Sequence, residues 1–147
     1  MHAALLHTHN LLRWVVLIAG VYAVIKAASG LSGDRPYASA RRASAIFMGS
    51  VHVQLLLGLL LFLFSPTVKE AMRDMAATMA DADARFVIAE HPTLMVLAAI
   101  VVTVGSIVAK GRATDAARHK SATIFMSVTL AMLLWGIPWK RALFPGM

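Results

Sequence analysis

Four long stretches of mostly apolar residues follow one another along the chain, separated by short polar segments. They cover about residues 3–28, 43–64, 86–109 and 117–139. A transmembrane helix needs roughly 20 consecutive apolar residues, and each stretch is close to that length or longer. The pattern therefore predicts an all-α fold, an integral membrane up-down four-helix bundle that forms a single domain over residues 1–147.

The polar segment between the second and third stretches is long enough for a short amphipathic helix, at about Thr67–Asp83. Met72, Met75 and Met79 recur there at helical spacing. One interpretation is a copper(I) site, because thioether sulfur suits soft metals. The other is an apolar face lying on the membrane or on the bundle. The second interpretation is favoured, since no histidine or cysteine accompanies the methionines.

Composition agrees with a membrane location. Hydrophobic residues make up 59% of the chain and charged residues 14%, whereas soluble domains have roughly 45–50% and about 25%. These proportions exclude a disordered chain, a typical cytosolic enzyme and a nucleic-acid-binding module. The chain contains no cysteine, which excludes disulfides, thiolate metal sites, iron–sulfur clusters and covalently attached c-type haem.

The charges predict an orientation in the membrane. There are 14 Lys and Arg against 7 Asp and Glu, and the basic residues outnumber the acidic ones in the first and third loops but not in the second. Because Lys and Arg accumulate in cytoplasmic loops, both termini are expected on the periplasmic side of a bacterial inner membrane. Lys140 and Arg141 in the tail oppose this orientation. The first stretch lacks a basic leader and a cleavage site, so we expect a retained helix.

Histidines are the candidate chemistry. The chain has six: His2, His7, His9, His52, His91 and His119. The last four fall one per predicted helix, and ionisable residues in membrane spans are functional candidates by default. In an up-down bundle the first and third helices are diagonal, which sets His9 opposite His91 in the outer half and His52 opposite His119 in the inner half. Because histidine is a common axial ligand of haem, the pattern predicts two stacked b-type haems, each bound by two histidines.

The inner pair faces a geometric difficulty. From the helical rise, His52 lies deeper than His119 by roughly 7–10 Å. One haem cannot bridge that offset unless a helix is tilted or the fourth helix begins earlier than the apolar pattern indicates. Otherwise His119 lies at headgroup level, and His52 is a lone polar group bonded to a neighbour such as Gln54 or Ser127.

Three further residues lie near the histidine face of their helices. Arg13 follows His9 by one turn, just inside the apolar stretch, and could pair with a haem propionate. Gly20 and Gly105 lie deeper, where small residues would let an inner porphyrin pass the backbone. The alternative is that these glycines allow close helix packing.

Several short segments occur in a characteristic order. They are His9-Asn10-Leu11-Leu12-Arg13-Trp14, His52-Val53-Gln54-Leu55-Leu56-Leu57-Gly58, Ser65-Pro66, Glu90-His91-Pro92-Thr93-Leu94-Met95, His119-Lys120 and Gly136-Ile137-Pro138-Trp139. Together they resemble a family of small four-span bacterial membrane proteins often labelled cytochrome B. The resemblance implies that the four histidines in these segments are haem ligands. It leaves out His2 and His7, although His7 could replace His9 half a turn away.

The predicted function is a membrane b-type cytochrome with two haems. It would move electrons between a quinone and a partner as a subunit of a respiratory or photosynthetic complex, rather than act as a stand-alone enzyme. The alternative is a haem-free accessory subunit that packs against other membrane-protein subunits. Metal or copper handling is a third interpretation. Membrane lipid is an expected partner in every case.

Overall fold

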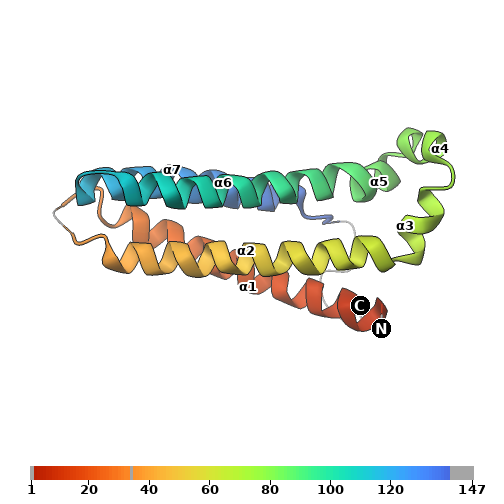
Figure 1. The fold of residues 1–147 in the computed structure, drawn as a ribbon, viewed down its shortest axis with the longest axis horizontal. Helices are drawn as coiled ribbons and strands as arrows, with labels where there is room; N and C mark the ends of the chain where they lie inside the picture. The colour runs from red at the N-terminus through yellow and green to blue at the C-terminus, as the bar shows by residue number, and fades with distance from the viewer. Residues whose placement is uncertain (1, 34, 140–147) are drawn as a thin grey trace.

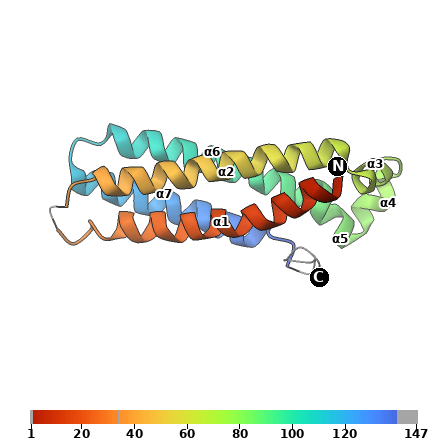
Figure 2. The same ribbon diagram turned by 90° about the horizontal axis from the view of Figure 1, so that it is seen from below.

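The computed structural model describes residues 2–33 and 35–139, and every regular element in these residues is a helix. The four long helices are α1 (His2–Ala28), α2 (Ala38–Phe64), α6 (His91–Gly111) and α7 (Asp115–Gly136). They run lengthwise side by side (Figures 1 and 2). The short elements are α3 (Pro66–Ala71), α4 (Met75–Ala80), α5 (Ala82–Arg85) and a π-helical turn, η1 (Phe86–Glu90). The predicted all-α class is confirmed for this part of the chain.

Three segments are long and apolar enough to cross a membrane by length and composition: His2–Ala28, Ala38–Phe64 and the continuous run Ala82–Gly111. These are the helices of a membrane-spanning protein. The second begins five residues before the predicted 43–64 stretch, and the third begins four residues before the predicted 86–109 stretch, with α5. Helix α7 is not among the three. Its first turns are polar, and serines and threonines along the rest of the helix lower its mean hydropathy.

Neighbour relations place α1 and α6 at opposite corners of the bundle. Helix α1 packs against α2 and α7, and α6 packs against the same two helices. Apolar side chains from all four meet along the middle, among them Val16, Phe47, Val102, Met126 and Leu133. A second cluster fills the end near the α1–α2 loop and consists mainly of alanine. Small residues let helices approach closely, so this end is narrow.

Gly20 and Gly105 serve this close packing. A Cβ on Gly105 would overlap the Phe125 side chain, and a Cβ on Gly20 would lie 2.9 Å from atoms of Phe47 and Leu130. Phe47 is fully buried. The space beside both glycines is thus filled by side chains. The structure therefore supports the alternative, that both glycines allow close helix packing.

We expect Gly105→Ala to lower the free energy of unfolding by about 1–3 kcal/mol, because the added methyl group must displace Phe125 in a packed core. Thermal unfolding of the detergent-solubilised chain measures this. The matched control is Gly49→Ala in α2, where a Cβ would meet nothing within 4 Å. Equal melting temperatures for the two variants would contradict the packing role.

Short capped turns replace the single helix predicted at Thr67–Asp83. Asp74 Oδ1 accepts a hydrogen bond from the Ala77 N–H at 2.9 Å, and Asp81 Oδ1 accepts one from the Ala84 N–H at 2.7 Å. Each aspartate is therefore an N-cap that starts a new helix, which divides the segment into α3, α4 and α5.

The three methionines do not share one helical face. Met72 follows the end of α3, whereas Met75 and Met79 belong to α4. Met72 and Met75 are both exposed. The prediction of a single methionine stripe on one helix is wrong.

Asp115 ties the α1–α2 loop to the start of α7. Its Oδ2 accepts a hydrogen bond from the Tyr37 backbone N–H at 3.1 Å, and its Oδ1 lies 2.7 Å from Arg118 Nη1. The bond from Tyr37, together with the Arg118 guanidinium, lowers the pKa of the Asp115 carboxyl. The ionised carboxylate therefore favours the folded state.

A pH dependence follows from this lowered pKa. The stabilisation by Asp115 is fully present above the ordinary aspartate pKa of about 3.9, and it is lost as the pH falls through the lower folded value. We expect the melting temperature of the native chain to fall more steeply than that of Asp115→Asn between about pH 5 and pH 2. Parallel pH profiles for the two chains would contradict this contribution.

Candidate functional site

A cavity of about 320 Å³ lies at the end of the bundle that holds the start of α1. Helix α7 ends at Gly136, whereas α2 continues farther toward this end of the bundle (Figure 1). The residues around the cavity come from all four long helices and from the residue that follows α7. They include His9, Arg13, Gln54, Gly58, His91, Met95, Leu133 and Ile137. Ligand pockets range from roughly 300 to 1,000 Å³, so the cavity is large enough to hold a bound group.

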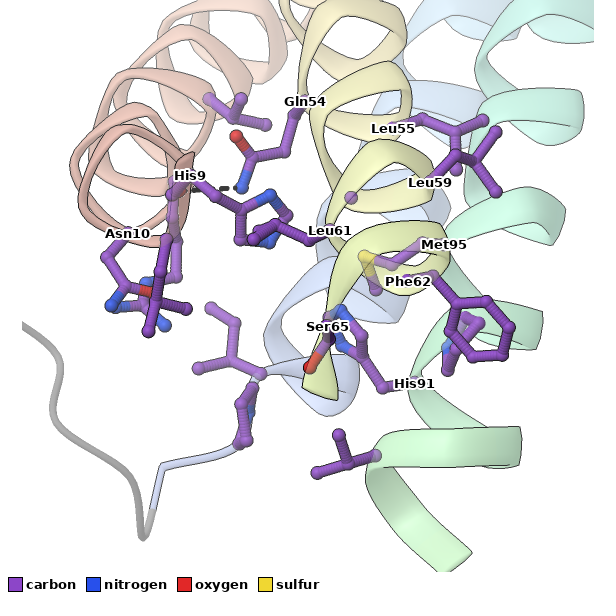
Figure 3. Close-up of a pocket in the computed structure, with 18 of the residues that line it drawn as sticks. His9, Asn10, Gln54, Leu55, Leu59, Leu61, Phe62, Ser65, His91 and Met95 are labelled. Atoms are coloured by element: carbon purple, nitrogen blue, oxygen red, sulfur yellow. Dashed lines mark hydrogen bonds between the residues drawn. The ribbon is translucent and has the colours of Figure 1, made fainter. Parts of the chain in front are cut away.

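His9 and His91 face each other in this cavity (Figure 3). Their ring centroids are 6.4 Å apart and their planes are inclined at 78°. Metal–imidazole bonds are about 2.0–2.1 Å long, so two imidazoles on opposite sides of one metal ion have centroids roughly 6.3 Å apart. The spacing of the pair therefore fits a shared metal ion.

The end of α7 orients His91. Its Nδ1 lies 2.6 Å from the Gly136 carbonyl oxygen. A carbonyl can only accept, so Nδ1 carries the proton and Nε2 keeps its lone pair. Gly136 is the last residue of α7, and the last carbonyls of a helix have no partner in their own helix. Metal-ligating histidines almost always donate their second N–H in this way.

The π-helical turn η1 prepares the position of His91. The His91 N–H donates to the Phe86 carbonyl, five residues earlier. Pro92 has no N–H, and in a regular α-helix its ring would clash with the Ile88 carbonyl. A wider π turn relieves that clash and shifts the helical register by one residue. Proline inside an apolar stretch was the signal for this distortion, which periodicity alone did not reveal.

His9 is held from α2. Gln54 Nε2 donates to the His9 carbonyl oxygen at 3.0 Å, the dashed line in Figure 3. A Cβ on Gly58 would lie 3.2 Å from His9 Cε1, so the ring rests directly on that glycine. His9 Nδ1 and Gln54 Oε1 are buried without a hydrogen-bond partner among the described residues. Buried polar atoms without partners are rare and indicate a missing ligand, ion or water.

Arg13 brings a permanent positive charge to the cavity wall. It lies one turn after His9 and is only 8% exposed. The guanidinium also lies 6.0 Å from the centre of the Trp14 ring. A buried arginine beside an apolar cavity can bind a carboxylate group of a ligand. Arg13 thus lines the cavity, and its pairing with a haem propionate stays a prediction.

Two site residues were missed from the sequence as contributors to this cavity. Gln54 and Gly58 lie one turn apart on α2, on the side that faces α1. A polar amide in an apolar stretch, followed by a glycine four residues later, was the available signal. His7 is exposed and is not among the residues that line the cavity. Of these two histidines, His9 is therefore the one that lines the cavity.

His52 and His119 have separate surroundings. His119 is 1% exposed, donates from Nδ1 to the Ala27 carbonyl at 2.8 Å, and packs against Tyr37 at a ring-centroid distance of 5.3 Å. His52 donates from Nδ1 to the carbonyl of Met48 on its own helix, at 2.8 Å. Its Nε2 lies 3.2 Å from the Thr103 hydroxyl on α6.

The predicted pairing of His52 with His119 is not found in the structure. Tyr37, which touches His119, immediately precedes α2. His52 follows fifteen residues later on that helix, a distance of about 22 Å along the axis. Two ligands of one iron need ring centroids roughly 6.3 Å apart. The structure therefore brings together His9 and His91 but not His52 and His119.

Within residues 2–33 and 35–139, no three histidine or acidic side chains gather to hold a metal ion. A zinc site takes three or four protein ligands, whereas a haem iron already bound by its porphyrin takes one or two. Two imidazoles in an apolar cavity suit the second case. The donor set therefore fits haem.

Comparisons of the chain with protein-family models, with curated proteins and with solved structures find no match. The resemblance to the four-span proteins labelled cytochrome B stays a prediction, and the function is argued from the geometry of this site.

Proposed function

We propose that this chain is a membrane b-type cytochrome that holds one haem between His9 and His91. The observation that carries the proposal is the pair of imidazoles, 6.4 Å apart, facing each other across an apolar cavity. Haem, when bound, supplies one-electron chemistry. A single site replaces the two that the sequence predicted.

Residues of the chain would both bind the haem iron and set its reduction potential. The Gly136 carbonyl fixes the tautomer of His91 so that its Nε2 points away from the helix end as a free ligand. Gly58 and the Gln54 amide fix the place of His9. The walls of the cavity are mostly apolar, and Arg13 adds positive charge. Axial ligands, burial and nearby charge are the terms that set a haem potential.

Helix α7 is proposed as a fourth span beside the three apolar segments. Its exposed side chains in the middle and later turns are apolar: Ile124, Val128, Leu134 and Trp135. Its polar residues His119, Ser121 and Thr129 are instead buried within the bundle. The low hydropathy of α7 thus comes from its charged first turns and from polar residues on its inner face. Its outer face suits lipid or a neighbouring subunit.

The distribution of charge supports an orientation. The α1–α2 loop and the α6–α7 loop lie at the same end of the bundle (Figure 1). That end carries Lys26, Arg35, Arg41, Arg42, Lys110, Arg112, Arg118 and Lys120. By the positive-inside rule this end faces the bacterial cytoplasm, and the haem lies on the periplasmic side. There it would exchange electrons with a quinone or with another membrane subunit.

The test is the haem content of the full chain purified in detergent. We expect a reduced-minus-oxidised spectrum with the sharp α-band of b-type haem, and one haem per chain in a pyridine haemochrome assay. Absence of bound haem after expression with ample haem supply would favour the haem-free accessory subunit. Two haems per chain would contradict the single site.

A further inference from the structure

A second, much smaller cavity lies between α2 and α6, at the end of the bundle opposite the histidine pair. Its volume is about 10 Å³, which is room for about one water-sized atom. Tyr37, Ser44 and Ser106 form its floor, and Ser44 and Ser106 are 3% and 4% exposed. Arg41 and Lys110 line it from exposed positions at the rim.

The two serine hydroxyls at the floor are unusual for helical serines. Ser50 and Thr103, on the same two helices, donate to carbonyls of their own helix. The Ser106 hydroxyl has no partner among the described residues, whereas the Ser44 hydroxyl lies beside that of Tyr37. Buried hydroxyls normally find an acceptor. The floor therefore offers the Ser106 hydroxyl without a partner among the described residues, beside the paired hydroxyls of Ser44 and Tyr37.

The two basic side chains at the rim favour a ligand with negative charge. The three ion pairs formed within the described residues do not involve Arg41 or Lys110. No carboxylate is among the described residues that line the cavity. Two cations above a floor of hydroxyl donors suit a group with several negatively charged oxygens, as in a phosphate.

The position of the cavity favours a phosphate that belongs to a lipid headgroup. Ile46 and Ile107 are exposed beside the serines, on the outer faces of α2 and α6. Both helices are apolar enough to span a membrane. A lipid headgroup held at the rim would therefore have its acyl chains along an apolar helix surface. Basic pockets between membrane helices bind anionic headgroups for this reason.

We infer that this cavity binds the phosphate group of an anionic phospholipid. One phosphate oxygen occupies the small cavity and accepts hydrogen bonds from Ser44 and Ser106. Arg41 and Lys110 hold the remaining oxygens at the rim. The site lies at the other end of the bundle from the haem site and does not depend on it.

Native mass spectrometry of the full chain in detergent, titrated with phosphatidylglycerol or phosphatidylcholine, tests this site. We expect one phosphatidylglycerol to bind more tightly than phosphatidylcholine. Arg41→Gln with Lys110→Gln should weaken it about 25-fold, at about fivefold for each cation. The matched control is Arg42→Gln with Lys120→Gln, which removes the same charge from the same end without touching the cavity. It should weaken binding less than about threefold.

A second pair of substitutions separates a built site from a diffuse basic surface. Ser44→Ala with Ser106→Ala keeps every charge and should still weaken phosphatidylglycerol binding several-fold. Unchanged affinity in this variant, or equal losses in the two charge variants, would overturn the proposal. So would equal affinity for the two lipids. Inorganic phosphate that binds in place of the lipid, with the same dependence on the serines, would assign the cavity to free phosphate and overturn the lipid assignment.

Discussion

Replacing either His9 or His91 by alanine is expected to remove all haem from the purified chain. The two imidazoles are 6.4 Å apart, the separation expected for two histidines that share one metal ion. Loss of a hydrogen-bond partner to a ligating histidine already lowers metal affinity about 10- to 100-fold, and loss of the ligand itself should exceed this. The haem-to-protein ratio should therefore fall from one to nearly none in both variants.

Three other histidines provide matched controls. His7→Ala removes an exposed imidazole two residues from His9. His52→Ala and His119→Ala remove the pair that the sequence assigned to an inner haem, and both should leave the haem content at one per chain. His119 is fully buried, so its variant needs a melting curve beside the spectrum. Half the haem lost in His52→Ala, or a haem retained in His91→Ala, would contradict the ligand assignment.

The sequence was sufficient to predict that His9 and His91 lie close together, because this prediction depends on few assumptions. His9 and His91 both lie close to the same end of the bundle, in helices that start from that end. Short loops force neighbouring helices to be antiparallel, which makes the first and third helices diagonal. Small errors in helix boundaries do not change this relation. Depth and diagonal placement were enough to bring the two rings together.

The inner pair failed because it depended on where α2 begins and on what the α1–α2 loop does. Helix α2 begins at Ala38, earlier than the apolar pattern indicated, and this lengthens the path to His52. Tyr37 folds over His119, and the Ala27 carbonyl takes its Nδ1 proton. These are contacts between residues far apart in the sequence. Local hydropathy carries no signal for them.

The contacts of the glycines could not be predicted from local hydropathy either. Gly20, Gly105 and Gly58 look alike in the sequence, each in an apolar stretch. In the structure the first two face aromatic side chains of neighbouring helices, and only Gly58 faces a histidine of the site. Which side chain a glycine accommodates depends on the rotation and crossing of whole helices. It therefore appears only in three dimensions.

Gly58→Leu should abolish haem binding while the fold persists. A Cβ at this position would already lie 3.2 Å from His9 Cε1, and the rest of a leucine would extend into the space of the imidazole. The Gln54 bond to the His9 carbonyl, one turn away, keeps the two backbones together, so the ring must turn aside. The leucine has an open cavity of about 320 Å³ to enter. We therefore expect little overpacking strain and a nearly unchanged melting temperature.

The control for this substitution lies on the same helix. Gly49→Leu adds the same side chain where a Cβ would meet nothing within 4 Å, and it should keep one haem per chain. Haem content in Gly58→Leu should fall at least about 10-fold, since a misplaced ligand loses at least as much as a histidine without its orienting partner. A Gly58→Leu chain with full haem and an unchanged spectrum would mean that His9 does not ligate from the position seen here. A loss of haem with an intact fold would instead show that haem binding depends on the His9–Gly58 contact. A haem-free accessory subunit would not need this contact.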